Sequence, residues 1–402
     1  MESEKFTPEM LGRFEAIVGK NNVSVEEADG RPVIRVCPNN TEQVAAVMRA
    51  GNEMGHGFVK ENLDIDLSAN MNRIIKFDHE NYYIKVQAGV SIEKMASRCF
   101  SGGCMLGNVI NSPDATASDL VYSNSPFIGM YRFGPSRNNV MNMEVALPDG
   151  TVIETGYDDI SAYMSGYNFN QLFVGAQDTL GKVCTVTFRV YPISDLRFLA
   201  FNFSDLKSAA PLINSIAKHP CIKPLFVGWA DSNHNKKHGY ENCASVVLIA
   251  LHGATRIVEA EAKEIVALAN GAVRLDDRLA TEMWKDVTVS PSGGAIIPVR
   301  NFAAFADKAA SDEKEDECIS GMLMDGQTAY FECCCGDDGC GLAKSAKDFG
   351  GRAASYENFF DENVSGAGAA AYMKELRNII VHHKTVPESQ KLSREVTPEV
   401  VA

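Results

Sequence analysis

The part of the chain that is most informative about chemistry is a glycine-punctuated stretch, residues 165–192. Gly175 and Gly181 precede an alternating apolar and polar run, residues 186–192, which predicts a half-buried strand. Because glycine has no Cβ atom, the main chain there can turn sharply and approach a ligand closely. Upstream, residues 142–153 contain two short strand patterns around a Pro-Asp-Gly turn, which predicts a hairpin.

A second unusual segment, Cys333–Cys340, holds four of the chain's 11 cysteines. The spacing of Cys335 and Cys340 is one that thiolate metal and iron–sulfur sites use. If the segment is instead a strand, Cys333 and Cys335 point into a core while Cys334 faces outward. A strand opposes the convergence of adjacent cysteines, so we predict no metal site here.

Two pairs of histidines are further candidates for acid–base or metal chemistry. His234 and His238 lie in a lysine-rich polar segment, and we expect them to be solvated. His382 and His383 end a helix pattern, where a cation complements the helix dipole. We therefore predict structural roles for both pairs.

The whole chain has 402 residues, of which 45% are hydrophobic and 22% charged, with a net charge of −14. This length predicts two to three structural units. An acidic protein repels nucleic acid and anionic lipid, so neither is expected as a main partner. No apolar run reaches 18 residues and no leader pattern starts at Met1, which predicts a cytoplasmic protein without a membrane span. Seven scattered cysteines are expected to be free in a reducing compartment: Cys37, Cys99, Cys104, Cys184, Cys221, Cys243 and Cys318.

The first hundred residues predict a β-α-β-β-α unit. Strand patterns cover residues 32–38, 63–67 and 82–88. Residues 41–54 form an amphipathic helix pattern with Thr41 as the expected N-cap. A second helix pattern begins at Ser91 and ends at Phe100.

After a turn-rich middle, the chain predicts an α+β unit. Strand patterns cover residues 196–202, 245–252 and 327–333, and helix patterns cover 206–219, 257–270 and 369–383. The charged residues 310–317 predict a loop. The predicted divisions are a first α/β subdomain (1–105), a second subdomain (106–195), a cap domain (196–320), a C-terminal segment that packs back (321–384) and a disordered tail (385–402).

Several of these segments together resemble the FAD-linked oxidases of the vanillyl-alcohol-oxidase type. They are the 165–192 stretch, Val86–Ser91, Ile65–Ile74, Tyr131–Gly134 and Pro298–Phe302. The branch that looks nearest is that of the glycolate oxidase and D-lactate dehydrogenase flavoprotein subunits. The resemblance implies an α+β fold, with a two-part FAD-binding domain of the p-cresol methylhydroxylase (PCMH) type followed by an α+β cap with an antiparallel sheet. In the resembled cap, His252 falls at a solvent-side turn, so we expect a structural role for it.

The departures from the family pattern concern the phosphate loops and the catalytic motifs. The family's glycine-rich loop before its Ile-Asp-Leu strand is missing, and residues 56–65 run straight across. Ser118 and Asp119 stand where the family has Gly-Gly, and residues 177–178 stand where it has Glu-Gly. Residues 284–287 lack the arginine of a Trp-x-x-Arg motif, and the His-x-Gly-Asp-Gly-Asn-x-His motif is absent.

Two interpretations of the cofactor site follow. The chain either binds FAD through a shortened site or keeps the fold without the cofactor. The cofactor contacts that the resemblance implies are Ser118, Asp119, Ser123, Asn124, Phe133, Gly134, Gly175, Gly181, Lys182 and Val183. A carboxylate at Asp119 would oppose a pyrophosphate. Cations that could replace lost donors are Lys60, Arg73, Arg132 and Arg137. Tyr131, Phe133 and Tyr167 either lie against a flavin ring or fill the core.

The resemblance implies an oxidoreductase that passes a hydride from a small 2-hydroxy acid to flavin N5. Arg300 is the candidate for holding the substrate carboxylate, and no general base is assigned. Electrons would then pass to an iron–sulfur or electron-transfer subunit. The alternative is a non-catalytic subunit that uses the same fold to scaffold a redox partner. A metal or redox-sensing role of the Cys333–Cys340 segment is a third hypothesis.

Overall fold

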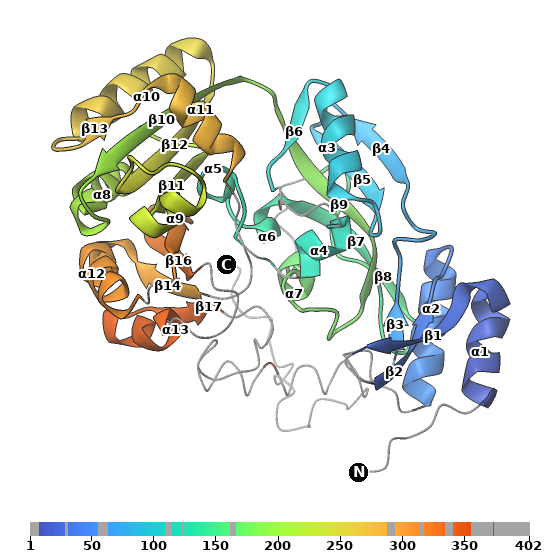
Figure 1. Ribbon diagram of the computed structural model, residues 1–402. Coiled ribbons are helices and arrows are strands. Elements are labelled where there is room, and N and C mark those ends of the chain that lie inside the picture. Colours follow the sequence, from blue (N-terminus) through green and yellow to red (C-terminus); the bar gives the residue numbers. More distant parts are fainter. Residues whose placement is uncertain are drawn as a thin grey trace, which may run out of the picture.

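A computed structural model describes residues 8–28, 31–54, 63–108, 115–122, 124, 126–160, 166–287, 294–313, 317–333, 341–354 and 373. The described strands form three sheets, of three, six and eight strands. The first two belong to the N-terminal half of the chain and the third to the C-terminal half (Figure 1). The predicted helix 369–383 and the tail lie outside the described residues, apart from residue 373.

The first sheet has the order β1-β2-β3, with β1 antiparallel and β3 parallel to β2. Its elements are α1 (Pro8–Val18), β1 (Val23–Ala28), β2 (Arg31–Val36), α2 (Thr41–Glu53) and β3 (Leu63–Ile65), with the short 3-10 helix η1 (Lys20–Asn22). Helix α2 buries Val44, Val47 and Met48, as its period predicts. Its N-cap is Asn40, whose side chain accepts from Gln43 N, so the prediction of Thr41 as cap was wrong by one residue.

The second sheet is antiparallel and has the order β4-β5-β9-β7-β8, with β6 also paired to β9. Its elements are β4 (Ile74–Asp78), β5 (Tyr83–Gln87), α3 (Ile92–Ser101), β6 (Cys104–Leu106), β7 (Val140–Ala146), β8 (Val152–Glu154) and β9 (Lys182–Pro192). The predicted hairpin is confirmed by the pairing of β7 with β8. Strand β9 begins four residues earlier than predicted, because both of its faces are buried and the alternation starts late.

Four short helices connect the strands of the second sheet. They are α4 (Ala117–Tyr122), α5 (Met130–Phe133), α6 (Ser136–Asn139) and α7 (Asn170–Phe173). Helix α5 lies between the second sheet and the eight-stranded sheet (Figure 1). After α7, Gln177 and Asp178 have φ angles of 51° and 56°, a left-handed conformation that glycine adopts more readily. The turn therefore occurs here without the glycine that the family has at this point.

The eight-stranded sheet, called the cap sheet below, has the order β13-β10-β12-β11-β15-β16-β14-β17, and neighbouring strands in this order are antiparallel. Its strands are β10 (Asp195–Phe203), β11 (Phe226–Ala230), β12 (Ser245–Gly253), β13 (Val273–Arg274), β14 (Gly294–Pro298), β15 (Ile319–Leu323), β16 (Thr328–Cys333) and β17 (Arg352–Ala354). Its helices are α8 (Ala210–Lys218), α9 (Ser232–Lys237), α10 (Thr255–Leu268), α11 (Asp277–Lys285), α12 (Phe302–Asp312) and α13 (Leu342–Ser345), with the 3-10 helices η2 (Lys207–Ala209), η3 (Val299–Asn301) and η5 (Ala346–Phe349). Helix α12 extends to Asp312, so the predicted loop at 310–317 was wrong in its first three residues.

Both faces of the cap sheet are covered, because successive side chains of a strand point to opposite faces. On β12, Val247, Ile249 and Leu251 pack into a core with α8, α10 and α12. On the opposite face, Leu248 packs with α11 and Ala250 packs with residues of α5 and its flanks. The second face therefore joins the cap sheet to the N-terminal half, and the predicted α+β class with an antiparallel cap sheet is confirmed.

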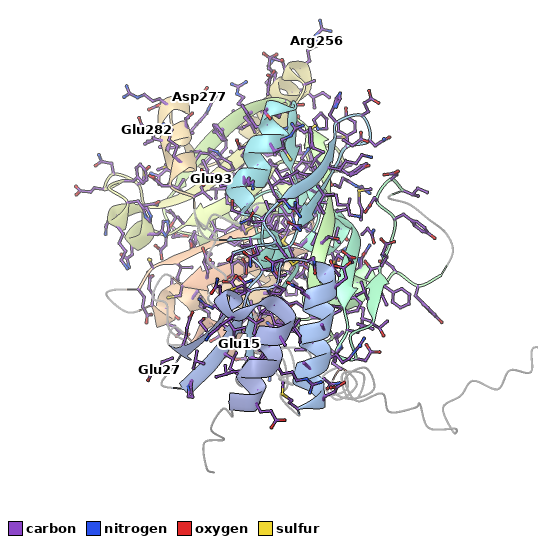
Figure 2. All side chains as sticks on the ribbon, turned by 90° about the vertical axis from the view of Figure 1, so that its right-hand side faces the viewer. Glu15, Glu27, Glu93, Arg256, Asp277 and Glu282 are labelled. Carbon is purple, nitrogen blue, oxygen red and sulfur yellow. The ribbon has the colours of Figure 1, made fainter. Side chains whose placement is uncertain are left out.

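Charged side chains project outward from the helices, as Glu93, Arg256 and Glu282 illustrate (Figure 2). Within the described part of the chain, no helix is both long and apolar enough to cross a membrane. Six of the seven scattered cysteines are free thiols, as predicted. Cys318 is disulfide-bonded, so the prediction that it is free was wrong.

Candidate functional site

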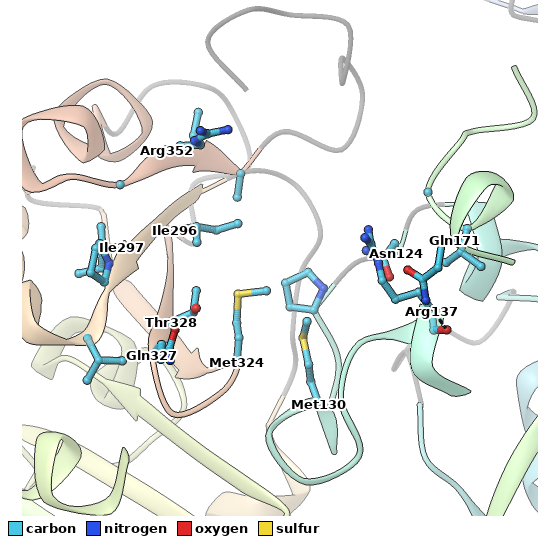
Figure 3. A pocket seen from close by; sticks show the side chains of 18 of the residues that line it. Asn124, Met130, Arg137, Gln171, Ile296, Ile297, Met324, Gln327, Thr328 and Arg352 are labelled. Carbon is cyan, nitrogen blue, oxygen red and sulfur yellow. Dashed lines mark hydrogen bonds between the residues drawn. The ribbon is translucent and has the colours of Figure 1, made fainter. Parts of the chain in front are cut away.

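A cavity of about 1040 Å³ lies between the N-terminal half and one end of the cap sheet. Figure 3 shows Asn124, Arg137 and Gln171 on the side of the N-terminal half. Ile296, Met324, Thr328 and Arg352 face them from the cap, and Met130 lies in the middle (Figure 3). The cavity is at the upper end of the roughly 300–1,000 Å³ that is typical of small-molecule sites.

The charge of this cavity is opposite to that of the whole protein. Its described lining contains four cationic side chains, Arg137, Lys218, Arg300 and Arg352. The same lining contains no aspartate, glutamate or histidine, although the chain carries a net charge of −14. Cations gathered in a concave site raise the local concentration of anions. The arrangement is suited to phosphate or carboxylate groups.

The two arginines from the cap are held at the ends of strands. Arg300 lies in η3, directly after β14, and has an exposed side chain. It is flanked by the buried Val299 and Phe302, and Val299 N donates to Gln327 O at 2.8 Å. Arg352 begins the edge strand β17, next to β14. Packing and pairing on either side thus place both guanidinium groups at the same end of the sheet.

Three of the predicted site residues line this cavity: Asn124, Gly175 and Arg300. Asn124 and Gly175 both have left-handed backbones, with φ of 47° and 86°. Gly175 N donates to Val121 O at 2.8 Å, and a Cβ atom on Gly175 would lie 3.3 Å from the Asn124 Cβ. Glycine thus allows the chain after α7 to lie against the segment after α4.

Apart from Asn124, the predicted residues before α7 have other roles in the described structure. Asp119 Oδ2 accepts hydrogen bonds from Thr116 N and Oγ1 at 2.7 and 2.8 Å, which closes the first turn of α4. Ser118 N donates to Ala88 O at 2.8 Å. Gly134 has a φ of 78° and lies close to Asn138. Ser123 lies outside the described residues.

The predicted residues at the start of β9 also lie outside the cavity lining. A Cβ atom on Gly181 would lie 2.8 Å from Ala146 O, so contact between β9 and β7 is sufficient to require glycine there. Lys182 Nζ pairs with Asp178 Oδ2 at 2.7 Å, and both side chains are mostly buried. Burial opposes the charge of Lys182, but the interaction with Asp178 outweighs it and raises the pKa of Lys182. Val183 is buried in the core.

The three aromatic residues predicted for the cofactor site also lie outside the cavity lining. Phe133 stacks on Tyr191 with ring centroids 3.9 Å apart and meets His252 edge-on at 6.2 Å. Tyr131 packs against the cap core and donates from its hydroxyl to Ile216 O. Tyr167 is 84% exposed, so it fills no core in this structure. Phe133 and Tyr131 thus join the N-terminal half to the cap.

Two expectations about histidines were wrong. His252 is only 5% exposed and lies within β12 rather than at a solvent-side turn, and burial followed by the charge of Arg132 lowers its pKa. His234 lies on α9, where burial lowers its pKa to about 4. Neither of these histidines lines the large cavity.

Lys218, Arg352 and Gln171 are cavity residues that the sequence did not indicate. Lys218 ends α8, Arg352 begins β17 and Gln171 lies on α7. Each is an isolated polar residue in an ordinary pattern, and only folding brings them together. Arg137 was predicted as a compensating cation. Of the other three candidates, Arg73 and Arg132 do not line the cavity, and Lys60 lies outside the described residues.

The architecture, with its antiparallel cap sheet over a two-part N-terminal half, defines the PCMH-type FAD-binding fold. The p-cresol methylhydroxylase structure with substrate bound superposes with a TM-score of 0.73 at 15% identity, over 92% of this chain and 94% of that one. The 4-ethylphenol oxidase from Gulosibacter chungangensis, in its isoeugenol complex, has a TM-score of 0.74 at 12% identity, over 95% and 97% of the two chains. At these identities the likeness concerns the fold alone.

In sequence, residues 32–156 match the family described as FAD binding domain. The D-lactate dehydrogenase [cytochrome] 1 of Saccharomyces cerevisiae mitochondria is 28% identical over 190 residues, or 46% of this chain and 32% of the yeast protein. The D-lactate dehydrogenase of Anaerostipes hadrus is 28% identical over 47% of this chain and 45% of that protein. The glycolate oxidase subunit GlcD of Bacillus subtilis is 24% identical over 65% and 56% of the two chains. The match spans less than half the length of the two D-lactate dehydrogenases.

The chain thus contains an FAD-binding domain and is similar to D-lactate dehydrogenases and to a glycolate oxidase subunit, and FAD is the cofactor that this relationship indicates. The cavity fits such a group, because FAD is an anionic molecule and the described lining offers four cations and no carboxylate. Gly175, Gly350 and Gly351 also allow main chain to approach a bound molecule on both sides of the cavity.

Proposed function

We propose that this protein is an FAD-dependent oxidoreductase that acts on a small 2-hydroxy acid in the cavity between its two halves. The observation that carries the proposal is the cationic, acid-free lining of that cavity. The names of the related D-lactate dehydrogenases and glycolate oxidase subunit support a 2-hydroxy acid as the substrate class.

The residues divide into two groups in this proposal. Arg300 holds the substrate carboxylate from the cap side, where Arg352 also lines the cavity. Asn124, Arg137 and Gly175 contact the cofactor from the N-terminal half. A bound flavin would supply the acceptor for a hydride from the hydroxyl-bearing carbon.

Oxidation of the alcohol to a 2-oxo acid also releases the hydroxyl proton. The described lining has no histidine, carboxylate, tyrosine or cysteine to accept it, so the acceptor is a water molecule or a side chain outside that lining. If FAD is bound, an iron–sulfur or electron-transfer partner subunit would take the electron pair from the reduced cofactor.

The acid-free lining of the cavity also favours a second candidate function, that of a non-catalytic subunit. Without an acid–base group in the described lining, the cavity could hold an anion or FAD and still not turn over substrate. In that case the fold serves as a scaffold for a redox partner, with weak or absent FAD binding.

Spectroscopy separates the two functions. The purified protein is incubated with FAD, freed of excess cofactor and titrated anaerobically with D-lactate and with glycolate. The oxidoreductase proposal expects a bound flavin band that bleaches on addition of one of these acids. A protein that takes up no FAD, or a bound flavin that neither acid bleaches, contradicts the proposed activity and supports the scaffold.

Arg300→Gln tests the assignment of the carboxylate clamp. Loss of a charge-assisted hydrogen bond of about 1.5–3 kcal/mol raises the substrate concentration for half-bleaching by roughly 10–150-fold. Arg278→Gln is the matched control, because the Arg278 side chain is 90% exposed on α11 and does not line the cavity. Equal titration curves for the two variants would remove Arg300 from the site.

A further inference from the structure

Two of the four cations that line the large cavity belong to neighbouring elements of the cap. Lys218 is the last residue of α8, and Arg300 lies in η3, which is in contact with α8. Both residues are exposed and both line the cavity. Within the described part of the chain, neither side chain has an ion-pair or hydrogen-bond partner. The described residues therefore leave two positive charges uncompensated on one wall of the cavity.

The turn between β15 and β16, which carries Gln327 on the cap side of the cavity (Figure 3), connects these two elements. A Cβ atom on Gly326 would lie 2.8 Å from Ala217 O, and Ala217 directly precedes the lysine. Gln327 O accepts a hydrogen bond from Val299 N at 2.8 Å, and Val299 directly precedes the arginine. The one carboxylate of this turn, that of Asp325, accepts from Gln327 N at 2.7 Å and does not line the cavity. The turn therefore holds the two cations at neighbouring positions.

A substrate with a single carboxylate would offset only one of these two charges. Arg300 is the candidate for holding that carboxylate, and Arg137, on the opposite side of the cavity, is assigned to the cofactor. Lys218 then remains available for a further negative group. Cations in a concave site attract anions, and a charge-assisted hydrogen bond to a carboxylate or phosphate is stronger than a neutral one.

The position of Lys218 also has an explanation that involves no ligand. A cation in the last turn of a helix complements the negative end of the helix dipole. Lys285 is likewise the exposed last residue of a helix, α11, but it does not line the cavity. A comparison of the two lysines therefore separates a role in binding from a role in the helix.

We propose that the substrate carries a second anionic group, a carboxylate or a phosphate, and that Lys218 binds it while Arg300 binds the carboxylate next to the hydroxyl group. This rests on the proposed oxidoreductase function and narrows its substrate class to dianionic 2-hydroxy acids. Lys218 is then a residue that determines specificity. D-Lactate and glycolate, which lack the second group, still bind and react but with lower affinity.

Calorimetric titration of the full chain, with and without bound FAD, tests the proposal without turnover. The probes are 2-oxo acids, the product form, in two pairs that differ in the second group. In one pair, 2-oxoglutarate is compared with 2-oxopentanoate, which has a methyl group in place of the second carboxylate. In the other, 3-phosphohydroxypyruvate is compared with hydroxypyruvate. At pH 7 and equal ionic strength, we expect the dianion of at least one pair to bind about three- to tenfold more tightly than its partner.

Three variants locate the preference for the dianion. Lys218→Gln removes the charge, and we expect it to abolish the preference. Lys218→Arg keeps the charge, and we expect it to retain the preference. Lys285→Gln is the matched control, because it removes the same kind of charge from the end of a helix outside the cavity lining. It should retain the preference of the wild-type protein.

Three results would overturn the proposal. They are equal affinities within both pairs of acids, a preference in Lys218→Gln as large as that in Lys285→Gln, or a loss of the preference in Lys218→Arg as complete as that in Lys218→Gln. Failure of the proposed function looks different, because it is read from FAD uptake and from flavin bleaching by D-lactate or glycolate. A flavin that bleaches in a protein without a preference for dianions contradicts only the present proposal.

Discussion

Asp158→Asn is expected to destabilise the N-terminal half, because Asp158 joins three strands of the second sheet. Lys85 Nζ on β5 lies 2.7 Å from Asp158 Oδ2. Asn142 Nδ2 on β7 and Thr187 Oγ1 on β9 donate to Oδ1 at 3.0 and 2.6 Å. The Asp158 and Lys85 side chains are 29% and 21% exposed, so solvent screens the cluster only in part.

The magnitude follows from these donors. Burial alone would raise the pKa of Asp158, but the hydrogen bonds from Lys85, Thr187 and Asn142 outweigh it and lower the pKa. A hydrogen bond to a charged group contributes about 1.5–3 kcal/mol, and an asparagine in this position keeps one acceptor oxygen but loses the charge. Allowing for partial exposure, we expect a loss of about 2–3 kcal/mol at pH 7.

The pH dependence has a definite sign. Because the folded-state pKa lies below the unfolded value of about 3.9, the contribution of Asp158 is fully present above that pH. It is lost as the pH falls through the folded-state pKa. The difference between the wild-type protein and the variant should therefore be constant from pH 7 to pH 5 and shrink below pH 4.

Thermal unfolding followed by circular dichroism measures this difference. For a folding unit of about 150–250 residues, 1 kcal/mol shifts Tm by about 2–4 °C, so Asp158→Asn should lower Tm by about 4–12 °C. Glu154→Gln is the control, since Glu154 is an exposed residue of β8 and is expected to change stability by less than about 0.5 kcal/mol. A Tm for Asp158→Asn equal to that of the control, or a difference that does not shrink at low pH, would refute this reasoning.

Other substitutions test the turns, the cap and the large cavity. Gly89→Ala would place a Cβ atom 2.3 Å from Leu67 O, so we expect it to lower the free energy of unfolding by more than about 3 kcal/mol. In Gly12→Ala, in α1, the new Cβ atom meets nothing within 4 Å, so we expect a gain of about 0.5–1 kcal/mol. Urea unfolding of the two variants measures both changes. Burial and the nearby positive groups lower the pKa of His234 to about 4. The wild-type cap therefore loses stability as the pH falls from about 6.5 to about 4, because the unfolded chain binds the proton first. His234→Asn should reduce that loss, which thermal melts at the two pH values measure. Arg137→Gln should weaken FAD binding about tenfold in a spectroscopic titration, and unchanged affinity would remove Arg137 from the cofactor site.

The sequence alone determined the elements with a clear hydrophobic period and turn chemistry. Helix α10 buries Val258, Ala262 and Ile265 at the expected spacing, and the Pro-Asp-Gly turn joins β7 to β8. Both results depend on contacts between residues that are close in the chain, which a linear pattern records. The resemblance to FAD-linked oxidases rested on such local segments and was confirmed.

Only the tertiary structure decided where the charges and histidines lie. Lys218 ends α8, Arg300 follows β14 and Arg352 begins β17, and the folding of the cap places them around one cavity. His252 occupies a strand position whose burial depends on Phe133 from the other half of the chain. No local pattern carries this information, because burial and electrostatic field at a residue are set by neighbours that are distant in sequence.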